Sequence, residues 1–203
     1  MPDLDDIVVD PPGIGEVLDV AGLFRRDGPV EMEIGTGKGG FLLRQARRHP
    51  ERNYFGIEWA NKYYLYAADR FRRWGLTNVR LMRTDARHLV VHQFPAEVIS
   101  ALHSYHPDPW PKKRHHKRRL FATEFVDAAV RALLPGARWA VQSDHAEYFE
   151  VIRQLLTDHP QLEPIEFDDP DYGTVEERTE TNFEVKYLRE GRWIGRLAVR
   201  KRE

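Results

Sequence analysis

The sequence contains no cysteine, which excludes disulfides, cysteine-ligated zinc, iron–sulfur clusters and thiol nucleophiles. It has no apolar run long enough to span a membrane, and it does not open with a basic and then apolar signal. We therefore expect a cytoplasmic protein with no membrane contact. An excess of one charge is also missing: the net charge is −1, so the chain as a whole is not a basic nucleic-acid coat.

What is present is typical of one soluble α/β domain. The chain has 203 residues, of which 41% are hydrophobic and 31% charged, enough for a substantial core. We treat residues 1–203 as a single domain with a loose acidic lead-in over residues 1–13. Charge is separated along the chain, because acids cluster at residues 3–10 and 163–180 and bases at 112–119. Such a local basic patch can bind phosphates even when the total charge is near zero.

The most informative stretch covers residues 106–120. Asp108 lies between Pro107 and Pro109, which restrict the backbone on both sides of it, and Trp110 follows. Six Lys or Arg side chains then fall within residues 112–119. A rigid acid beside a dense positive patch favours a site that grips a polyanion and acts on a group within it. The alternative is a tight turn before a solvated helix, and Trp110 fits either a base-stacking surface or a core anchor.

Hydrophobic periodicity and turn residues predict alternating strands and helices through the first four-fifths of the chain. The expected strands cover residues 30–34, 53–57, 79–82, 97–105 and 137–142, and the expected helices 14–24, 41–50, 61–74, 117–134 and 145–159. An acidic loop containing a strand (163–171), a helix or β-hairpin (181–191) and an antiparallel last strand (193–199) follow. The pattern predicts a mostly parallel sheet with helices on both faces.

Four acids fall at or just after the carboxyl ends of expected strands: Glu58, Asp85, Asp108 and Asp144. Ligands of parallel α/β sheets bind outside that edge. The same edge would hold the glycine loop over residues 35–40, where the chain can approach a ligand closely. We therefore expect the functional site at this edge.

The glycine loop alone is ambiguous between dinucleotide binding and other cofactors. Glu33 precedes it, and a carboxylate there suits an ammonium or sulfonium ligand better than a pyrophosphate. S-adenosylmethionine is such a ligand, with Glu58 accepting from its ribose hydroxyls and Asp85 from its adenine amino group. The alternatives are an exposed edge-strand acid for Glu33 and simple helix caps for Glu58 and Asp85.

These residues carry a resemblance. The segment Glu33–Gly39 resembles the cofactor loop of class I methyltransferases. Gly56-Ile57-Glu58, Asp85-Ala86 and above all the segment Pro107–Arg119 resemble the tRNA (guanine-N7)-methyltransferase family. Ser143-Asp144 and Thr181-Asn182-Phe183-Glu184, which also has the spacing of a capping box, match further elements of that family.

The resemblance implies a Rossmann-like class I methyltransferase fold, S-adenosylmethionine as cofactor, tRNA as partner and methyl transfer to N7 of a variable-loop guanosine. Around the cofactor it implies Glu33, Glu58, Asp85 and Asp108; we add Gly35, Gly37, Trp59 and Ala86 and expect Asp108 to be the catalytic residue. Around the tRNA it implies Lys112, Asp144, Thr181, Asn182, Phe183 and Glu184, the last four within a substrate-binding insertion over residues 163–191. We expect Arg118 and Arg119 to add contacts to the tRNA. A monomer or a homodimer is expected.

Guanine N7 carries a free lone pair, so methylation needs in-line positioning more than proton removal. We expect Asp108 to position guanine or cofactor, the bases of residues 112–119 to hold phosphates, and the target base to unstack. His103, His115 and His116 define no convergent ligand set, and no metal is expected. Two other classes compete: a nicotinamide-dependent oxidoreductase, which Glu33 and the glycine spacing disfavour, and a non-catalytic RNA-binding protein, which would have no need of a cofactor pocket.

Overall fold

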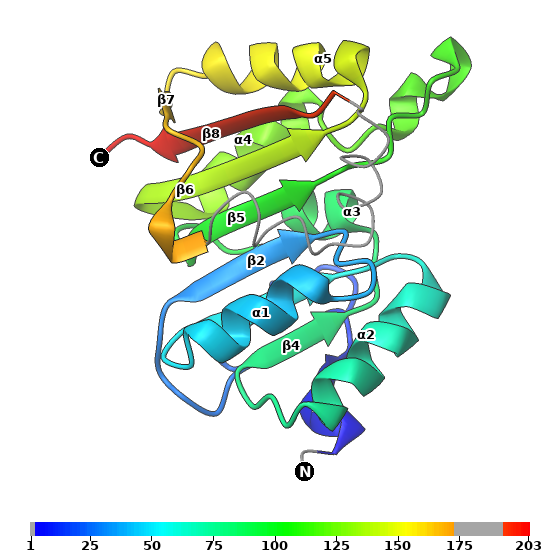
Figure 1. Cartoon of the computed structure of the whole chain (residues 1–203), viewed down its shortest axis with the longest axis vertical. Helices are drawn as coiled ribbons and strands as arrows, with labels where there is room; N and C mark the ends of the chain where they lie inside the picture. The colour runs from blue at the N-terminus through cyan, green and yellow to red at the C-terminus, as the bar shows by residue number, and fades with distance from the viewer. Residues whose placement is uncertain (1–2, 173–192) are drawn as a thin grey trace.

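The computed structural model of the chain describes residues 3–172 and 193–203. Its centre is one sheet, with the strand order β1-β4-β3-β2-β5-β6-β8-β7 (Figure 1). The strands are β1 (Val8–Val9), β2 (Val30–Ile34), β3 (Asn53–Ile57), β4 (Val79–Met82), β5 (Ile99–Tyr105), β6 (Leu133–Ser143), β7 (Leu162–Ile165) and β8 (Gly195–Lys201). Neighbouring strands from β1 to β6 pair in parallel, and β8 pairs antiparallel with β6 and β7. The predicted fold class is confirmed.

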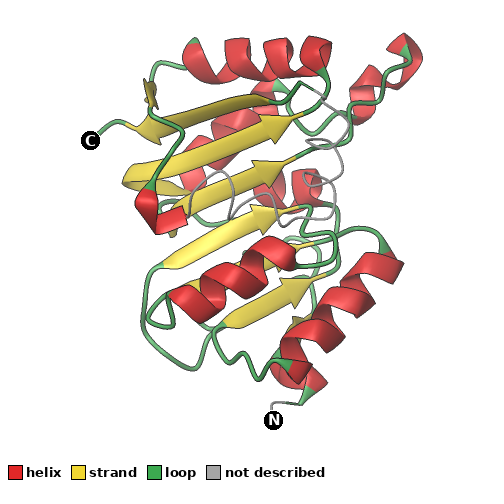
Figure 2. Cartoon of the chain, in the orientation of Figure 1, coloured by secondary structure: helices red, strands yellow, loops and turns green. Residues whose placement is uncertain are grey.

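Helices cover both faces of this sheet (Figure 2). They are α1 (Gly40–Arg48), α2 (Asn61–Arg73), α3 (Ala86–His92), α4 (Thr123–Ala132) and α5 (Ala146–Thr157), with short 3-10 turns η1 (Leu4–Asp6), η2 (Lys113–Arg118) and η3 (Pro170–Tyr172). None of the helices in the described part of the chain combines the length and apolar character needed to cross a membrane.

The sheet separates two apolar cores. On one face, α1 and α2 bury Phe41, Ala67 and Phe71 against β3 and β4. On the other, α3, α4 and α5 bury side chains such as Phe125 and Ile152 against β2, β5 and β6. Burial of this kind, at roughly 25 cal/mol per Å² of apolar surface, holds the strands in register and so fixes the positions of their carboxyl ends.

Two predicted helices differ from the structure. Residues 14–24 form turns, because Glu16 and Asp19 bond locally to the N–H groups of Gly13 and Gly22, which competes with a helix. The helix predicted over 117–134 is wrong at both ends. The basic run forms η2, α4 begins only at Thr123, and Leu133 already pairs with Ile99 in the sheet.

Smaller elements escaped prediction. The lead-in is not wholly loose, since Val8 and Val9 pair with Leu81 and Met82 as an edge strand. The short helix α3 was also missed, although its N-cap, Asp85, was noted as a possible cap. A two-residue strand and a two-turn helix carry too little periodicity to read from sequence. The expected strand near 163–171 is β7, and the segment 181–191 lies outside the described residues.

Candidate active site

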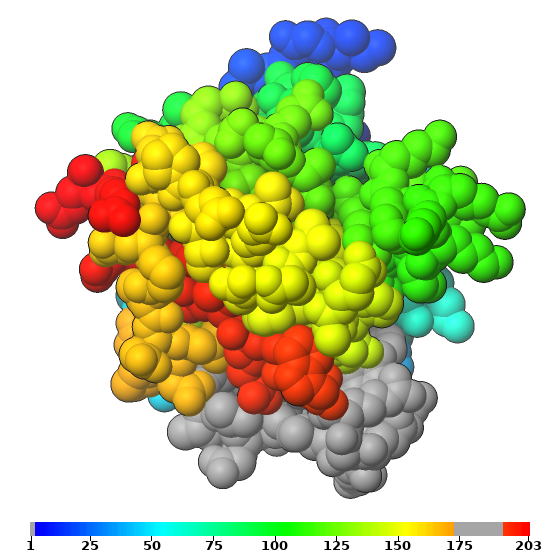
Figure 3. All heavy atoms as spheres, turned by 90° about the horizontal axis from the view of Figure 1, so that it is seen from above, coloured from blue at the N-terminus to red at the C-terminus, as the bar shows by residue number. Residues whose placement is uncertain are grey.

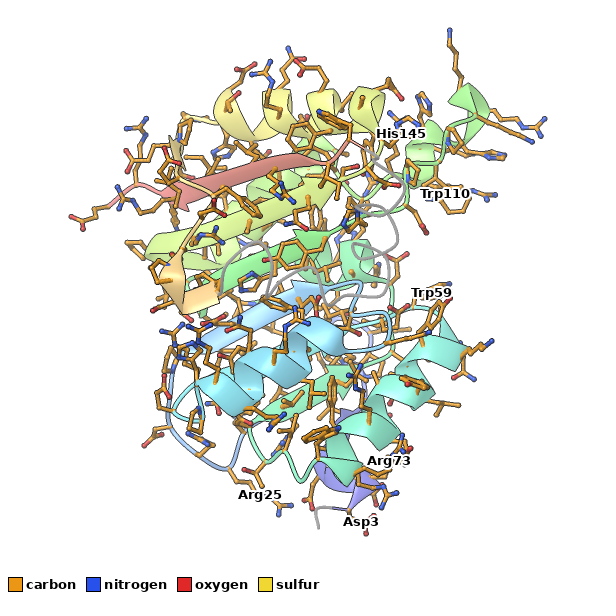
Figure 4. All side chains as sticks on the ribbon, in the orientation of Figure 1. Asp3, Arg25, Trp59, Arg73, Trp110 and His145 are labelled. Carbon is orange, nitrogen blue, oxygen red and sulfur yellow. The ribbon has the colours of Figure 1, made fainter. Side chains whose placement is uncertain are left out.

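Four of the five central parallel strands each have one of the predicted acids at or just after their carboxyl ends. Glu58 directly follows β3, Asp85 follows β4, Asp108 follows β5 and Asp144 directly follows β6. Strand β2, which ends in the glycine loop, lies between β3 and β5. Figure 4 shows Trp59 and Trp110 at this same edge, on opposite halves of the sheet. The predicted convergence on one edge is confirmed.

The glycine loop leaves open space at two of its glycines. Gly35 (φ 81°) and Gly37 (φ 52°) adopt left-handed backbone, and a Cβ on either would meet no atom of the described residues within 4 Å. Gly39 differs, because a Cβ there would lie 2.5 Å from the Phe71 ring. Gly39 is therefore required for packing α1 against α2, whereas Gly35 and Gly37 form an open cradle that a ligand can approach.

Glu58 ties this loop to the start of α2. It is 8% exposed; its Oε2 accepts from the Gly37 N–H at 2.7 Å and its Oε1 from the Ala60 N–H at 2.7 Å. Asp85 caps α3, with Oδ1 accepting from the N–H groups of Arg87 and His88. The capping interpretation of Asp85 is thus confirmed, and its exposed carboxylate also lies at the ligand edge. Trp59 is 67% exposed beside Glu58, and Ala86 opens α3.

Glu33 is buried in β2, so the edge-strand alternative for it is wrong: β2 is central and Glu33 is 4% exposed. Its Oε2 has no hydrogen-bond partner among the described residues. Burial raises the pKa of Glu33 to about 8; the charge of Arg44 opposes this rise and that of Glu58 adds to it. A buried carboxyl oxygen that lacks a hydrogen bond is costly. A cationic ligand at the glycine loop would offset that cost, so the residues fit an ammonium- or sulfonium-bearing cofactor.

We expect Glu33→Gln to stabilise the ligand-free protein while weakening the cofactor site. Because the folded pKa is raised from 4.5 to about 8, the stability that Glu33 contributes is full below pH 4.5 and lost as pH rises through 8. The melting temperature of the variant should therefore exceed that of wild type increasingly from pH 5 to pH 9. At pH 9, calorimetry should show affinity for S-adenosylmethionine lower by about tenfold or more, the loss typical of a hydrogen bond to a charged group. A variant that is less stable at pH 9 and binds normally would make Glu33 a purely structural residue.

The turn carrying Asp108 is held in a strained conformation. His106 (φ 53°) and Trp110 (φ 42°), on either side of it, both adopt left-handed backbone, which is rare for such residues and costs about 1–3 kcal/mol each. The His106 N–H donates to the Gln142 carbonyl at 2.8 Å, and its Nδ1 lies 3.5 Å from Asp144 Oδ1. Asp108 itself is exposed. The surrounding contacts thus present its carboxylate at the edge, and His106 packs near the turn as predicted.

Arg119 does not have the exposed position predicted for it. It is 5% exposed, its Nε donates to the Pro109 carbonyl at 2.8 Å, and its two terminal nitrogens donate to the Glu147 carboxylate at 3.0 and 2.7 Å. Its guanidinium also lies over the Tyr148 ring. The phosphate contact predicted for Arg119 is therefore disfavoured, because its guanidinium is buried and bonded within the protein. Arg119 instead fastens the Asp108 turn to α5.

We expect Arg119→Ala to slow the reaction without changing the salt dependence of RNA binding. Losing the bond to Pro109 loosens the turn that positions Asp108, and a misplacement of about 1 Å can cost up to about a hundredfold. Arg119→Lys should restore part of the rate, since one ammonium cannot reproduce the planar fork. Glu147→Ala should resemble Arg119→Ala, although it removes a negative charge. Two measurements separate support of the Asp108 turn from contact with a phosphate: single-turnover rates with saturating tRNA, and salt titrations of tRNA binding. A lower salt slope with an unchanged rate would show that Arg119 contacts a phosphate.

The other five bases of the run remain exposed: Lys112, Lys113, Arg114, Lys117 and Arg118. None has an acid within 4 Å among the described residues. Arg118 lies over the Trp110 ring, 5.0 Å from its centroid, and His115 meets that ring edge-on. Figure 3 shows this part of the chain, in green, standing out from the body beside α5. Trp110 is thus a half-buried surface residue that joins the Asp108 turn to the basic run, and not a deep core anchor.

One buried polar network was not predicted. His103 lies at 3.1 Å from Glu31 and 3.0 Å from the Tyr105 hydroxyl, and Arg52 bridges Glu31 to Asp171. Burial lowers the pKa of His103, although Glu31 opposes this shift. Burial would raise the pKa of Glu31, but His103 and Arg52 outweigh it and lower that pKa. These residues are far apart in sequence, so no local motif could reveal them. Among the described residues no group of three acidic or histidine side chains is placed to hold a metal.

The architecture is that of S-adenosylmethionine-dependent methyltransferases. It is similar to an O-methyltransferase of this kind from Thermotoga maritima, with a TM-score of 0.56 and 17% identity over 88% of this chain and 61% of that one. A family model described as a putative methyltransferase matches residues 27–197.

Curated relatives specify the family further. The chain is 38% identical to the tRNA (guanine-N(7)-)-methyltransferase of Alkalilimnicola ehrlichii, covering 95% of this chain and 81% of that protein. It is 36% identical to the corresponding protein of a Nocardioides species, covering 97% and 76%. The chain therefore belongs to the tRNA (guanine-N(7)-)-methyltransferase family, and the resemblance found in the sequence is confirmed.

Proposed function

We propose that this protein transfers the methyl group of S-adenosylmethionine to N7 of a guanosine in the variable loop of tRNA. The observation that carries this proposal is the position of Asp108. It lies on a braced turn at the carboxyl edge, with the open glycine cradle and the buried Glu33 on one side and the exposed basic run on the other. A tRNA substrate also favours a cytoplasmic location for the enzyme.

The cofactor would be held by Glu33, Gly35, Gly37, Glu58, Trp59, Asp85, Ala86 and Asp108. When bound, it supplies an electrophilic methyl group on a sulfonium. Glu33 would face the cationic end, the two glycines would admit the ligand close to the backbone, and Glu58 and Asp85 would accept hydrogen bonds from hydroxyl and amino groups. A pyrophosphate would meet the carboxylate of Glu58 and could not stabilise an ionised Glu33 as a cation does, which disfavours a nicotinamide dinucleotide.

The tRNA would be held by phosphate contacts from Lys112 and Arg118, with Asp144 and the residues Thr181, Asn182, Phe183 and Glu184 near the guanosine. These last four lie outside the described residues. Guanine N7 attacks with a lone pair that it already has, so no proton leaves before the bond forms. Asp108 would accept hydrogen bonds from the guanine N–H groups and hold N7 in line.

The direct test is incubation with labelled S-adenosylmethionine and unmodified tRNA, followed by chemical cleavage at N7-methylguanine. The expected result is one cleavage site, in the variable loop, that depends on both protein and cofactor. Thermal-shift titration with S-adenosylhomocysteine and with a nicotinamide dinucleotide runs in parallel. Stabilisation by the dinucleotide alone, without methyl transfer, would favour the oxidoreductase alternative, and tRNA binding without cofactor binding would favour a non-catalytic protein.

A further inference from the structure

Helix α2 carries a stripe of basic and aromatic side chains that the proposed reaction does not use. Lys62, Tyr66, Arg70 and Trp74 follow one another at intervals of four residues, so they share one side of the helix. Tyr66 is 47% exposed and Trp74 52% exposed. At 1.5 Å per residue the stripe is about 18 Å long.

Two further cations reach the same stripe from the side of α1. Lys38, in the glycine loop, has its Nζ 5.9 Å from the Tyr66 ring centroid, and Arg70 donates to the Lys38 carbonyl at 3.3 Å. Arg47, near the end of α1, has its guanidinium carbon 4.3 Å from the Trp74 ring centroid. We call this surface the α2 ridge, defined by Lys38, Arg47, Lys62, Tyr66, Arg70 and Trp74.

The charge on the α2 ridge is not balanced locally. In the described part of the chain, no acid lies within 4 Å of the charged groups of Lys38, Arg47, Lys62 or Arg70. The one acid of α2, Asp69, pairs instead with Arg72 and Arg73, each at 2.9 Å. Asp69 lies on the same side of α2 as Lys62 and Tyr66, but its carboxylate is already paired with Arg72 and Arg73. Lys62 and Arg70 therefore have no acid partner among the described residues, and they alternate with half-exposed aromatic rings.

The α2 ridge begins at the candidate active site. Helix α2 starts three residues after Glu58, and Lys38 belongs to the glycine loop itself. The exposed basic run leaves the same edge from the other half of the sheet, after β5 (Figure 1). Trp59 and Trp110 mark the two sides of that edge (Figure 4). A polyanion whose base lies at Asp108 therefore has one positive surface on each side.

We infer that the α2 ridge is a second RNA-binding surface, which contacts the tRNA backbone on the side of the active site opposite the basic run. Cations spaced along a helix match phosphates, and exposed rings between them offer stacking for unpaired bases. The inference rests on the proposed function, because it takes tRNA as the substrate. It adds that the protein contacts the tRNA on both sides of the active site at the carboxyl edge of the sheet.

The test compares three double variants that each remove two positive charges: Lys62→Ala/Arg70→Ala on the ridge, Lys117→Ala/Arg118→Ala on the basic run, and Arg153→Ala/Arg200→Ala as control. Both control arginines are exposed, lie outside α2 and are paired with acids, Glu150 and Glu163. Affinity for unmodified tRNA is measured over a salt series, and S-adenosylhomocysteine binding reports on the fold. The ridge and basic-run variants should each lower the salt slope by about two units, while the control leaves it unchanged.

Each result decides between the two surfaces. A normal salt slope for the ridge variant, with a reduced slope for the basic-run variant, overturns this inference and leaves the proposed function intact. If the wild-type protein does not bind tRNA and neither double variant changes this, both the inference and the proposed function are overturned. If the ridge is instead a protein interface, sedimentation should show a dimer that dissociates on Tyr66→Ala or Trp74→Ala while tRNA binding is kept, which also overturns the inference.

Discussion

Replacing Asp108 with Asn is expected to lower the single-turnover rate of methyl transfer by about a hundredfold, the loss typical of a misplaced positioning group. The amide keeps an acceptor but adds a donor, which would face the guanine's own N–H groups. Because Asp108 is exposed on a turn held by other contacts, the substitution should leave the fold intact. Binding of tRNA should be largely kept, since phosphate contacts dominate its affinity. The loss should therefore appear in kcat, at saturating tRNA.

The neighbouring acid provides the comparison for this experiment. Asp144 lies at the end of the adjacent strand and contacts His106, so Asp144→Asn tests an acid of the same edge that touches the same turn. We expect a smaller loss from it than from Asp108→Asn. A near wild-type rate for Asp108→Asn, or a tenfold loss that disappears at saturating tRNA, would show that Asp108 does not position the reaction, and Asp144 would then be the stronger candidate.

Gly37→Val is expected to abolish measurable cofactor binding. Its Cβ would point into open space, so the protein itself does not need that space, and the two added methyl groups would occupy the cradle that the ligand needs. The substitution also strains the backbone, because valine at φ 52° is a conformational outlier. Calorimetry with S-adenosylhomocysteine measures the loss directly.

A matched substitution separates the two effects. Gly75, at the end of α2, also has a left-handed backbone (φ 66°), and a Cβ there meets no atom of the described residues within 4 Å. Gly75→Val therefore carries a similar strain away from the cradle and should bind the cofactor normally at a temperature where both variants are folded. Equal binding by both variants would reduce Gly37 to a structural turn, whereas equal loss would assign the effect to strain.

The sequence by itself determined where the main strands lie along the chain, that their sheet is mostly parallel and at which edge of it the site lies. Strand β3 was predicted with the bounds the structure has, because a short, mostly apolar run between polar segments is a local signal; all five of its residues are buried. The positions of Glu58, Asp85, Asp108 and Asp144 followed from the strands, since acids after parallel strands necessarily share an edge. The proline-flanked Asp108 and the family motif predicted methyl transfer, because both are patterns of consecutive residues that can be recognised without the fold.

Only the tertiary structure decided which charges are available. Arg119 looks like its neighbours in sequence, but packing against α5 places it between Pro109 and Glu147, 28 residues further along the chain. Glu33 is buried, with one carboxyl oxygen that has no hydrogen bond among the described residues, only because β2 is central in the sheet. The α2 ridge likewise needs Lys38 and Arg47 to meet side chains of another helix. The environments of Arg119, of Glu33 and of the α2 ridge all depend on contacts between segments that are distant in sequence. The burial that determines whether a charged side chain is paired or ionised exists only once those contacts have formed.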